Sequence, residues 1–303
     1  MAIVICNQGG GVGIPDAAAR LQAGATALDA VEQGIWPVEA DPENHTVGYG
    51  GWPNLLGAVE LDACMMDGTT LRSGAVGALQ GFLHPISAAR RVMEQLPHVL
   101  LVGEGAARFA GECGLQRIDN LTPEAAAYYA RWCEENMPQG AEGQPLRELA
   151  WRAADPMHTH GTTVYLAQDA AGHLAAGVST SGWSLKYPGR LGDSPIVGAG
   201  SYADTRYGAA ACIGQGELTI RTSTARSVVL YLKQGLDLRS ACHEAMTDLM
   251  YLSSDLLSFV MIHAIDAAGS HCALCWGKHP DPHYWVWQTG DAVPRLVPAE
   301  VVS

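Results

Sequence analysis

Apolar residues recur every three or four positions in several stretches of the chain, the spacing that gathers them on one face of an α-helix. The first stretch covers residues 15–33, and its Pro15-Asp16 start suits a first helical turn. The same spacing predicts helices over residues 87–96, 103–113, 122–135, 223–234 and 237–249. The helix at 122–135 opens with Thr122-Pro123-Glu124-Ala125, which resembles a capping box.

Shorter apolar or β-branched runs predict strands between these helices. They cover residues 1–7, 58–66, 162–166, 174–179 and 259–265, with turn formers such as Asp67-Gly68 at their ends. Residues 138–145 are rich in turn formers and lack apolar periodicity, so we interpret them as a linker. The chain therefore mixes helices with an antiparallel sheet, which is an α+β class, and it contains no visible internal repeat.

Composition narrows the possible functions. A chain of 303 residues that is 48% hydrophobic can bury a large core, as one large domain or two modest ones. A net charge of -13 without any run of lysines or arginines opposes binding to phosphate backbones, so we expect no nucleic-acid partner. The first seven residues lack a basic region and are too short for a signal peptide or membrane span, which predicts a cytoplasmic protein without membrane contact.

The eight cysteines and the paired histidines give little support to metal or redox chemistry. Most cysteines stand in apolar surroundings, which favours reduced thiols in the core. Cys272 and Cys275 match CxxC but have no second pair, and in a strand they need not face the same way. His158 and His160 could ligate a metal, yet no cluster of carboxylates or cysteines supports them. We therefore expect no metal and no cofactor.

A glycine-rich segment, residues 8–13, follows the first predicted strand, where a dinucleotide-binding loop would lie. Its spacing does not match G-x-G-x-x-G, because Ile14 stands where the third glycine belongs. We interpret it as a flexible loop near a substrate pocket.

The candidate chemistry lies in the second half of the chain. His160-Gly161-Thr162-Thr163-Val164 runs towards Ser179-Thr180-Ser181-Gly182, and a polar segment follows at residues 189–195. A threonine that becomes an N-terminus combines nucleophile and base, because its hydroxyl attacks and its own α-amine takes the proton.

With these segments the chain resembles the glycosylasparaginase, plant-type asparaginase and isoaspartyl peptidase family of N-terminal nucleophile hydrolases. The resemblance extends over residues 24–32, 47–51, 61–77 and 179–203 and thins out beyond Gly216. It implies a four-layer αββα sandwich, one domain over residues 1–303, and self-cleavage into residues 1–161 and 162–303. It also implies a homodimer of cleaved protomers.

The resemblance assigns roles around the cleavage site. It makes Thr162 the nucleophile, released by a cut after Gly161, and Thr180 the hydroxyl that orients it. The spacing between these segments selects Thr162 over its neighbour Thr163.

The resemblance also assigns the substrate-binding residues. Arg190 matches the arginine that holds the substrate's α-carboxylate, Asp193 the carboxylate that holds its α-ammonium, and Gly214 a glycine that lines the oxyanion site and the amino-group pocket. A guanidinium pairs bidentately with a carboxylate, and an aspartate supplies the acceptor that an ammonium requires. Singly, each residue could equally be a strand threonine, a turn ion pair or a turn glycine; their joint order and spacing favour the functional interpretation.

The chain departs from the family pattern in four ways. Gly161 replaces the aspartate that precedes the nucleophile in glycosylasparaginases, and Thr163-Val164 replaces a more common Val or Ile followed by Gly. Ile213 stands where a threonine usually contributes a hydroxyl to the oxyanion site. A tryptophan expected near Asn7 is absent.

The sequence thus predicts an amidohydrolase that cleaves the β-amide of L-asparagine derivatives through an acyl-enzyme on Thr162. The leaving group stays open between N-acetylglucosamine, an amino acid and ammonia, with a rim formed by residues 9–13, Trp52, Trp183 and Tyr187. The alternative is a catalytically weak binding protein on the same scaffold, which would keep Arg190 and Asp193 but lose turnover because of Ile213.

Overall fold

The computed structural model describes residues 1–137, 145–154, 161–254 and 258–303, and it contains two β-sheets. The larger sheet has the strand order β12-β11-β1-β5-β6-β2-β3-β4, and the smaller one the order β13-β10-β9-β8-β7. The strands of the larger sheet are β1 (Ile3–Asn7), β2 (Leu61–Asp67), β3 (Ser73–Leu79), β4 (Leu100–Val102), β5 (Thr163–Gln168), β6 (Leu174–Thr180), β11 (His283–Gln288) and β12 (Arg295–Pro298). Those of the smaller sheet are β7 (Ser201–Asp204), β8 (Gly208–Gly214), β9 (Phe259–Asp266), β10 (His271–Gly277) and β13 (Glu300–Val302).

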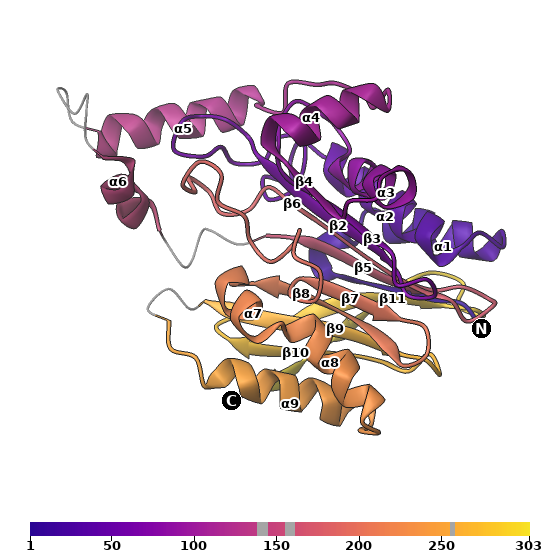
Figure 1. Cartoon of the computed structure of the whole chain (residues 1–303). Helices are drawn as coiled ribbons and strands as arrows, with labels where there is room; N and C mark the ends of the chain where they lie inside the picture. Colours follow the sequence, from indigo (N-terminus) through magenta and orange to yellow (C-terminus); the bar gives the residue numbers. More distant parts are fainter. Residues whose placement is uncertain (138–144, 155–160, 255–257) are drawn as a thin grey trace.

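Helices lie on the outer side of each sheet, and the two sheets face one another (Figure 1). Helix α2 packs on β5 and β6, and α3 on β2 and β3, whereas α8 and α9 pack on the smaller sheet. The helices are α1 (Ile14–Gln22), α2 (Ala27–Ala40), α3 (Pro85–Gln95), α4 (Gly103–Glu112), α5 (Pro123–Asn136), α6 (Leu146–Ala153), α7 (Gly216–Thr222), α8 (Thr224–Lys233) and α9 (Leu238–Met250).

The central strands are buried on both faces. Ile5 and Val164 belong to the core between the two sheets, whereas their neighbours Val4 and Tyr165 face the helices above the larger sheet. A third core lies between the smaller sheet and helices α7 to α9. Because both faces are buried, the sequences of these strands are continuous apolar runs and do not alternate between apolar and polar residues.

Most elements predicted from the sequence are confirmed, and one is wrong. The helices expected near residues 87–96, 103–113, 122–135, 223–234 and 237–249 are α3, α4, α5, α8 and α9, and all five expected strands form. Residues 15–33, expected to be one helix, instead contain all of α1 but its first residue and the first half of α2. The break falls at Gly24, whose φ of +80° suits glycine, and Thr26 then caps α2 through a capping box with Asp29.

Several short elements were not expected, among them α6, α7 and the edge strands β4, β12 and β13. They have three to eight residues, too few for a clear apolar period. The linker expected over residues 138–145 lies outside the described residues except for Pro145, which precedes α6.

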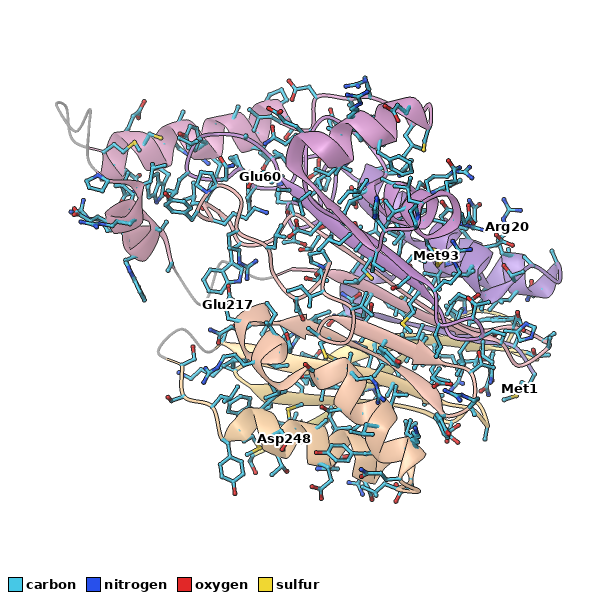
Figure 2. All side chains as sticks on the ribbon, viewed as in Figure 1. Met1, Arg20, Glu60, Met93, Glu217 and Asp248 are labelled. Carbon is cyan, nitrogen blue, oxygen red and sulfur yellow. The ribbon has the colours of Figure 1, made fainter. Side chains whose placement is uncertain are left out.

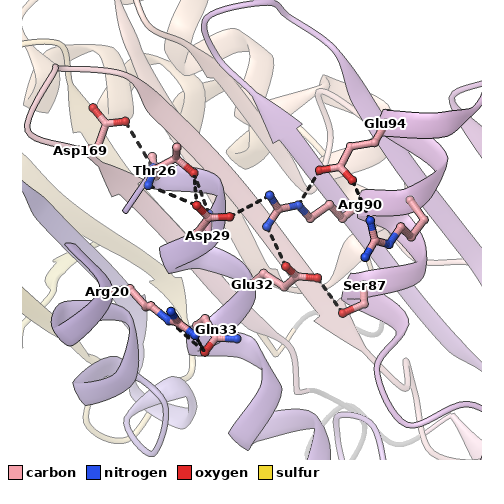
Figure 3. Close-up of polar contacts among 11 residues, drawn as sticks. Arg20, Thr26, Asp29, Glu32, Gln33, Ser87, Arg90, Glu94 and Asp169 are labelled. Atoms are coloured by element: carbon pink, nitrogen blue, oxygen red, sulfur yellow. Dashed lines mark hydrogen bonds and ion pairs between the residues drawn. The ribbon is translucent and has the colours of Figure 1, made fainter. Parts of the chain in front are cut away.

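Helices α2 and α3 are joined at the surface by Arg90 (Figure 3). Its guanidinium contacts Asp29 at 2.8 Å and Glu32 and Glu94 at 2.7 Å each. Ser87 donates a second hydrogen bond to Glu32, at 2.7 Å. Because several charges share one partly buried cation, this network holds the helices together better than an isolated surface pair would.

The cysteines are free thiols, and the CxxC pair is divided by the sheet. Cys272 packs towards α9 and Cys275 into the core between the sheets. The Sγ of Cys272 instead lies 3.6 Å from the Sγ of Cys242 on α9. Within the described ranges, every helix is too short or too polar to cross a lipid bilayer.

A first prediction concerns the contact between β3 and α3. A Cβ added to Gly74 would overlap the backbone of Ala89 and Met93 in α3, so Gly74→Ala should lower the free energy of unfolding by about 1–3 kcal/mol. Gly105 in α4 has open space around it, and Gly105→Ala should be neutral or stabilising by about 0.5–1 kcal/mol. Urea unfolding of both variants checks this, and equal stabilities would contradict the close contact.

Candidate active site

Thr162 lies where two cavities meet. The small cavity, of about 10 Å³, holds roughly one water molecule. It is lined by Gly161, Thr162, Thr180, Gly182, Trp183, Arg190, Gly192, Asp193, Ser194 and Gly214. All six residues that the sequence singled out for cleavage, catalysis and substrate binding therefore lie together. The large cavity, of about 640 Å³, opens on the other side of Thr162.

The Thr162 hydroxyl lies beside the peptide bond that precedes it. Its Oγ1 donates a hydrogen bond to the carbonyl oxygen of Gly161 at 2.8 Å and lies 3.3 Å from Oγ1 of Thr180. Thr163 is buried, and its hydroxyl lies 3.5 Å from Oδ1 of Asn7 instead. Of the two neighbouring threonines, only Thr162 lines both cavities.

Asn7, at the end of β1, fixes the backbone around Thr162. Its Nδ2 donates to the carbonyl of Thr162 at 2.8 Å, and its Oδ1 accepts from the N–H of Val164 at 2.9 Å. Strands β1 and β5 pair as far as Cys6 and Tyr165, so the side chain of Asn7 continues the pairing beyond them. This role was not expected from the sequence, where the only signal was a polar residue at the end of an apolar strand.

Thr180, the last residue of β6, contacts the same carbonyl as Thr162. Its Oγ1 donates to the carbonyl oxygen of Gly161 at 2.7 Å and accepts from the N–H of Gly182 at 2.9 Å. A donor aimed at a carbonyl oxygen stabilises negative charge that develops there. The peptide bond between residues 161 and 162 is thus polarised next to a hydroxyl.

Strand β6 is anchored by the buried carboxylate of Glu39. It accepts hydrogen bonds from Ser179 Oγ at 2.7 Å and from the N–H of Ile86 at 2.9 Å, and it lies 3.1 Å from Nδ1 of His84. Burial raises the pKa of Glu39, although His84 and Ser179 act in the opposite direction. This anchor adjoins Thr180 and was also not expected from the sequence.

Position 161 has no space for a side chain. A Cβ added to Gly161 would overlap the side chain of Thr46. Thr46 is itself fixed, because its N–H and its hydroxyl donate to Oδ1 of Asn44 at 3.1 and 2.8 Å. The packing thus accounts for glycine at this position, where glycosylasparaginases have aspartate.

Arg190 faces the small cavity but pairs with a residue that the sequence analysis missed. Its Nε and Nη2 donate to Oε1 of Glu217 at 2.9 and 2.7 Å, and Glu217 belongs to α7 (Figure 2). Its guanidinium carbon lies 4.8 Å from the ring centre of Trp183. The ion pair between Arg190 and Asp193 that a simple turn would give therefore does not form. Trp183, expected at the rim, packs against Arg190 instead.

Asp193 is a buried carboxylate with one strong neutral donor. Its Oδ2 accepts a hydrogen bond from Thr219 of α7 at 2.7 Å. Burial raises the pKa of Asp193 to about 6, against the lowering effects of Thr219 and Arg190. A buried group with a raised pKa that lines a cavity is typical of a functional site.

Gly214, at the end of β8, lines both cavities. Its φ is +109°, and a Cβ there would overlap the carbonyl of Phe259, so the position requires glycine. The preceding Ile213 lines the large cavity and packs against the core between the sheets. It brings no hydroxyl to the site.

Part of the expected rim lies in the large cavity and part does not. Gly9 and Trp52 line it. Gly11 packs under Trp285, and Tyr187 lies outside both cavities. The ring of Trp52 is held by stacking on His45 and Tyr128, with centroid distances of 3.9 and 4.2 Å.

No group of three or more potential metal ligands occurs in the ranges that the structure covers. The His158–His160 pair lies outside the described residues.

The family model described as Asparaginase matches residues 14–296 of the chain. The chain belongs to this asparaginase family.

Two relatives are equally similar to the chain but carry different names. The N(4)-(Beta-N-acetylglucosaminyl)-L-asparaginase of Elizabethkingia miricola is 41% identical over 226 residues, which are 75% of this chain and 62% of that protein. The isoaspartyl peptidase of Salmonella typhimurium is 41% identical over 229 residues, 75% of this chain and 72% of that protein. The N(4)-(Beta-N-acetylglucosaminyl)-L-asparaginase of Rattus norvegicus is 35% identical over 273 residues, 84% of this chain and 78% of that protein. The chain thus spans less than two thirds of the first of these proteins, and identity does not choose between the names.

The raised pKa of Asp193 leads to a second prediction. Because the pKa in the folded protein lies above the ordinary value of 3.8, protonated Asp193 contributes to the free energy of unfolding. This contribution is fully present below pH 3.8 and is lost as the pH rises through about 6. Asp193→Asn mimics the protonated form, so it should raise the free energy of unfolding at pH 8 by up to about 3 kcal/mol and have little effect near pH 4. Urea unfolding in a Thr162→Ala background, which removes the candidate nucleophile, measures this. A difference independent of pH would contradict it.

Proposed function

We propose that this chain is an N-terminal threonine amidohydrolase that cleaves the β-amide of L-asparagine derivatives. The carrying observation is that the hydroxyls of Thr162 and Thr180 both contact the carbonyl of Gly161 in the cavity that Arg190 and Asp193 line. The substrate class comprises N4-(β-N-acetylglucosaminyl)-L-asparagine, β-aspartyl peptides and L-asparagine. The names of the relatives support this class.

The chain first cuts itself between Gly161 and Thr162. The Thr162 oxygen attacks the Gly161 carbonyl carbon, the C–N bond breaks, and the hydroxyl proton passes to the departing nitrogen. Water then hydrolyses the resulting ester, which leaves a carboxylate on Gly161 and a free hydroxyl and α-amine on Thr162. The hydrogen bond from Thr180 supports the step, since negative charge develops on the oxygen that it contacts.

After the cut, the substrate's β-carbonyl takes the place of the Gly161 carbonyl. The α-amine of Thr162, with an ordinary pKa near 8, accepts the hydroxyl proton and passes it to the departing amine. Water releases the aspartyl group from Thr162 in the second half of the reaction. The small cavity holds about 10 Å³ in the uncut chain, so Gly161 has to move away before substrate binds.

Arg190 and Asp193 bind the two charged groups of the aspartyl half. Nε and Nη2 of Arg190 already donate hydrogen bonds to Glu217. Nη1 packs against Gly192, 3.0 Å from the position that a Cβ on this glycine would take. Nη1 therefore remains to meet the α-carboxylate. The α-ammonium of the substrate keeps Asp193 ionised, which offsets its burial.

Ile213 stands where the family pattern has a threonine, so the oxyanion site lacks the hydroxyl of that threonine. The hydroxyl of Thr180 already donates to the carbonyl that occupies this place in the uncut chain. We assign it the missing role, in addition to orienting Thr162.

A second candidate is a weakly catalytic amino-acid-binding protein on the same scaffold, favoured only by the apolar Ile213.

For the enzyme we further propose one αββα N-terminal nucleophile hydrolase domain over residues 1–303, a homodimer of cleaved protomers and a cytoplasmic location. Two sheets separate three hydrophobic cores, and this arrangement supports the four-layer fold.

A third prediction is self-cleavage into chains of 161 and 142 residues, the second being 303 minus 161. Thr162→Ala should stay intact, because it lacks the attacking hydroxyl, and Thr180→Val should cleave at least tenfold more slowly, because it loses the donor to the scissile carbonyl. Intact-mass analysis over time measures both. A wild-type chain that stays whole but turns over substrate would refute the mechanism, and one that stays whole and inactive would favour the binding protein.

A fourth prediction concerns the aspartyl half. Arg190→Ala and Asp193→Ala should each lower kcat/KM for the best substrate about thirtyfold or more, because a charged group of the substrate loses its partner. Arg206→Ala is a matched control, since Arg206 is exposed, pairs with Asp204 and lines neither cavity. Steady-state kinetics on cleaved proteins checks this, and near wild-type values for Arg190→Ala would reduce Arg190 to a structural residue.

A further inference from the structure

The two cavities that meet at Thr162 differ in charge. The small one holds Arg190 and Asp193, which face the aspartyl half of the substrate. The large one lies beyond Thr162 and receives the leaving group. Its volume of about 640 Å³ is typical of small-molecule pockets, so size alone does not restrict the leaving group to ammonia.

Lysine and arginine are absent from the wall of the large cavity, as far as the described residues define it. The segments outside the described residues, 138–144, 155–160 and 255–257, contain neither lysine nor arginine in their sequence. Recognition of a carboxylate normally uses such a cation. The two cavities therefore differ in chemistry as well as in size, because only the small one is lined by an arginine.

Two histidines that line the large cavity, His279 and His283, do not supply the missing charge. Burial lowers the pKa of His279, which disfavours its charged form, and its Nδ1 accepts a hydrogen bond from the N–H of Asp281 at 3.3 Å. The Nδ1 of His283 lies 3.2 Å from the carboxylate of the same Asp281. A positive charge on His283 would thus already be balanced.

His45 and Glu43, which also line the large cavity, offer no unpaired positive charge either. His45 contacts the carbonyl of Gly50 through Nδ1 at 2.8 Å, and its Nε2 lies 3.5 Å from a carboxylate oxygen of Glu124. Glu43 is exposed and lines the cavity directly. The net charge of -13 adds a long-range repulsion of anions.

We propose that the large cavity selects against carboxylates, so that the enzyme cleaves β-aspartyl amides whose departing amine carries no carboxylate in preference to β-aspartyl dipeptides. Sugar amines and uncharged alkylamines are such leaving groups. A β-aspartyl dipeptide must place the carboxylate of its second residue in the large cavity, where no cation meets it. The inference rests on the proposed function and narrows its substrate class.

The test compares two substrates that differ only in this charge. They are β-aspartyl-leucine and β-aspartyl-leucinamide, assayed with the self-processed enzyme at pH 7.5. We expect kcat/KM to be about tenfold higher for the amide, equivalent to about 1.4 kcal/mol. A ratio of three or more supports the proposal, and a smaller ratio overturns it while leaving the proposed function intact. Inactivity on both substrates, on L-asparagine and on N4-(β-N-acetylglucosaminyl)-L-asparagine would refute the proposed function and this inference with it.

Two charge-reversal variants locate the selectivity. Glu43→Lys adds a cation to the cavity wall and should reduce the ratio at least threefold, by raising kcat/KM for the dipeptide. Glu244→Lys makes the same change in net charge on the exposed side of α9, away from both cavities, and should leave the ratio within twofold of the wild type. Equal changes in both variants would assign the selectivity to net charge and overturn the role of the cavity wall.

Discussion

The side-chain amide of Asn7 is the contact on which the geometry of the site depends. Its two hydrogen bonds reach the residues on either side of Thr163, where the backbone pairing of β1 and β5 ends. Because β1 and β5 are buried on both faces, neither strand can shift without breaking the ladder and two cores. The backbone of Thr162 is therefore positioned by the first strand of the chain, while its hydroxyl lies at the start of β5, beside the carbonyl of Gly161.

The same sheet explains how a cut chain would keep its shape. In the order β12-β11-β1-β5-β6-β2-β3-β4, groups of one to three strands from before and after position 161 alternate. Three ladders, β11–β1, β1–β5 and β6–β2, join the two parts. Breaking the bond before Thr162 removes one covalent link and none of these hydrogen bonds. The smaller sheet and α7 contribute Gly214, Thr219 and Glu217, so both sheets are needed to complete the site.

The sequence predicts what depends on local pattern. Long apolar periods predicted α3, α5 and α9. The family resemblance assigned Thr162 and Thr180, and the spacing between their motifs chose Thr162 over Thr163. The sequence did not predict the break at Gly24, because the alanines on both sides continue the helical period and only the backbone conformation reveals the interruption. Nor did it predict Glu217, which reaches Arg190 from 27 residues away in a helix of seven residues. Partners of this kind are set by how distant segments pack, and no local period records them.

The contact between Thr46 and Gly161 has a consequence for how this family diversifies. The residue before the nucleophile and the side chain that faces it share one small volume, so the first cannot grow unless the second shrinks or moves. A lineage that acquires an aspartate before its threonine has to open the facing position first, through a smaller side chain or a displaced loop. The two positions would then covary across related sequences, with glycine before the nucleophile wherever the facing side chain stays as large as threonine.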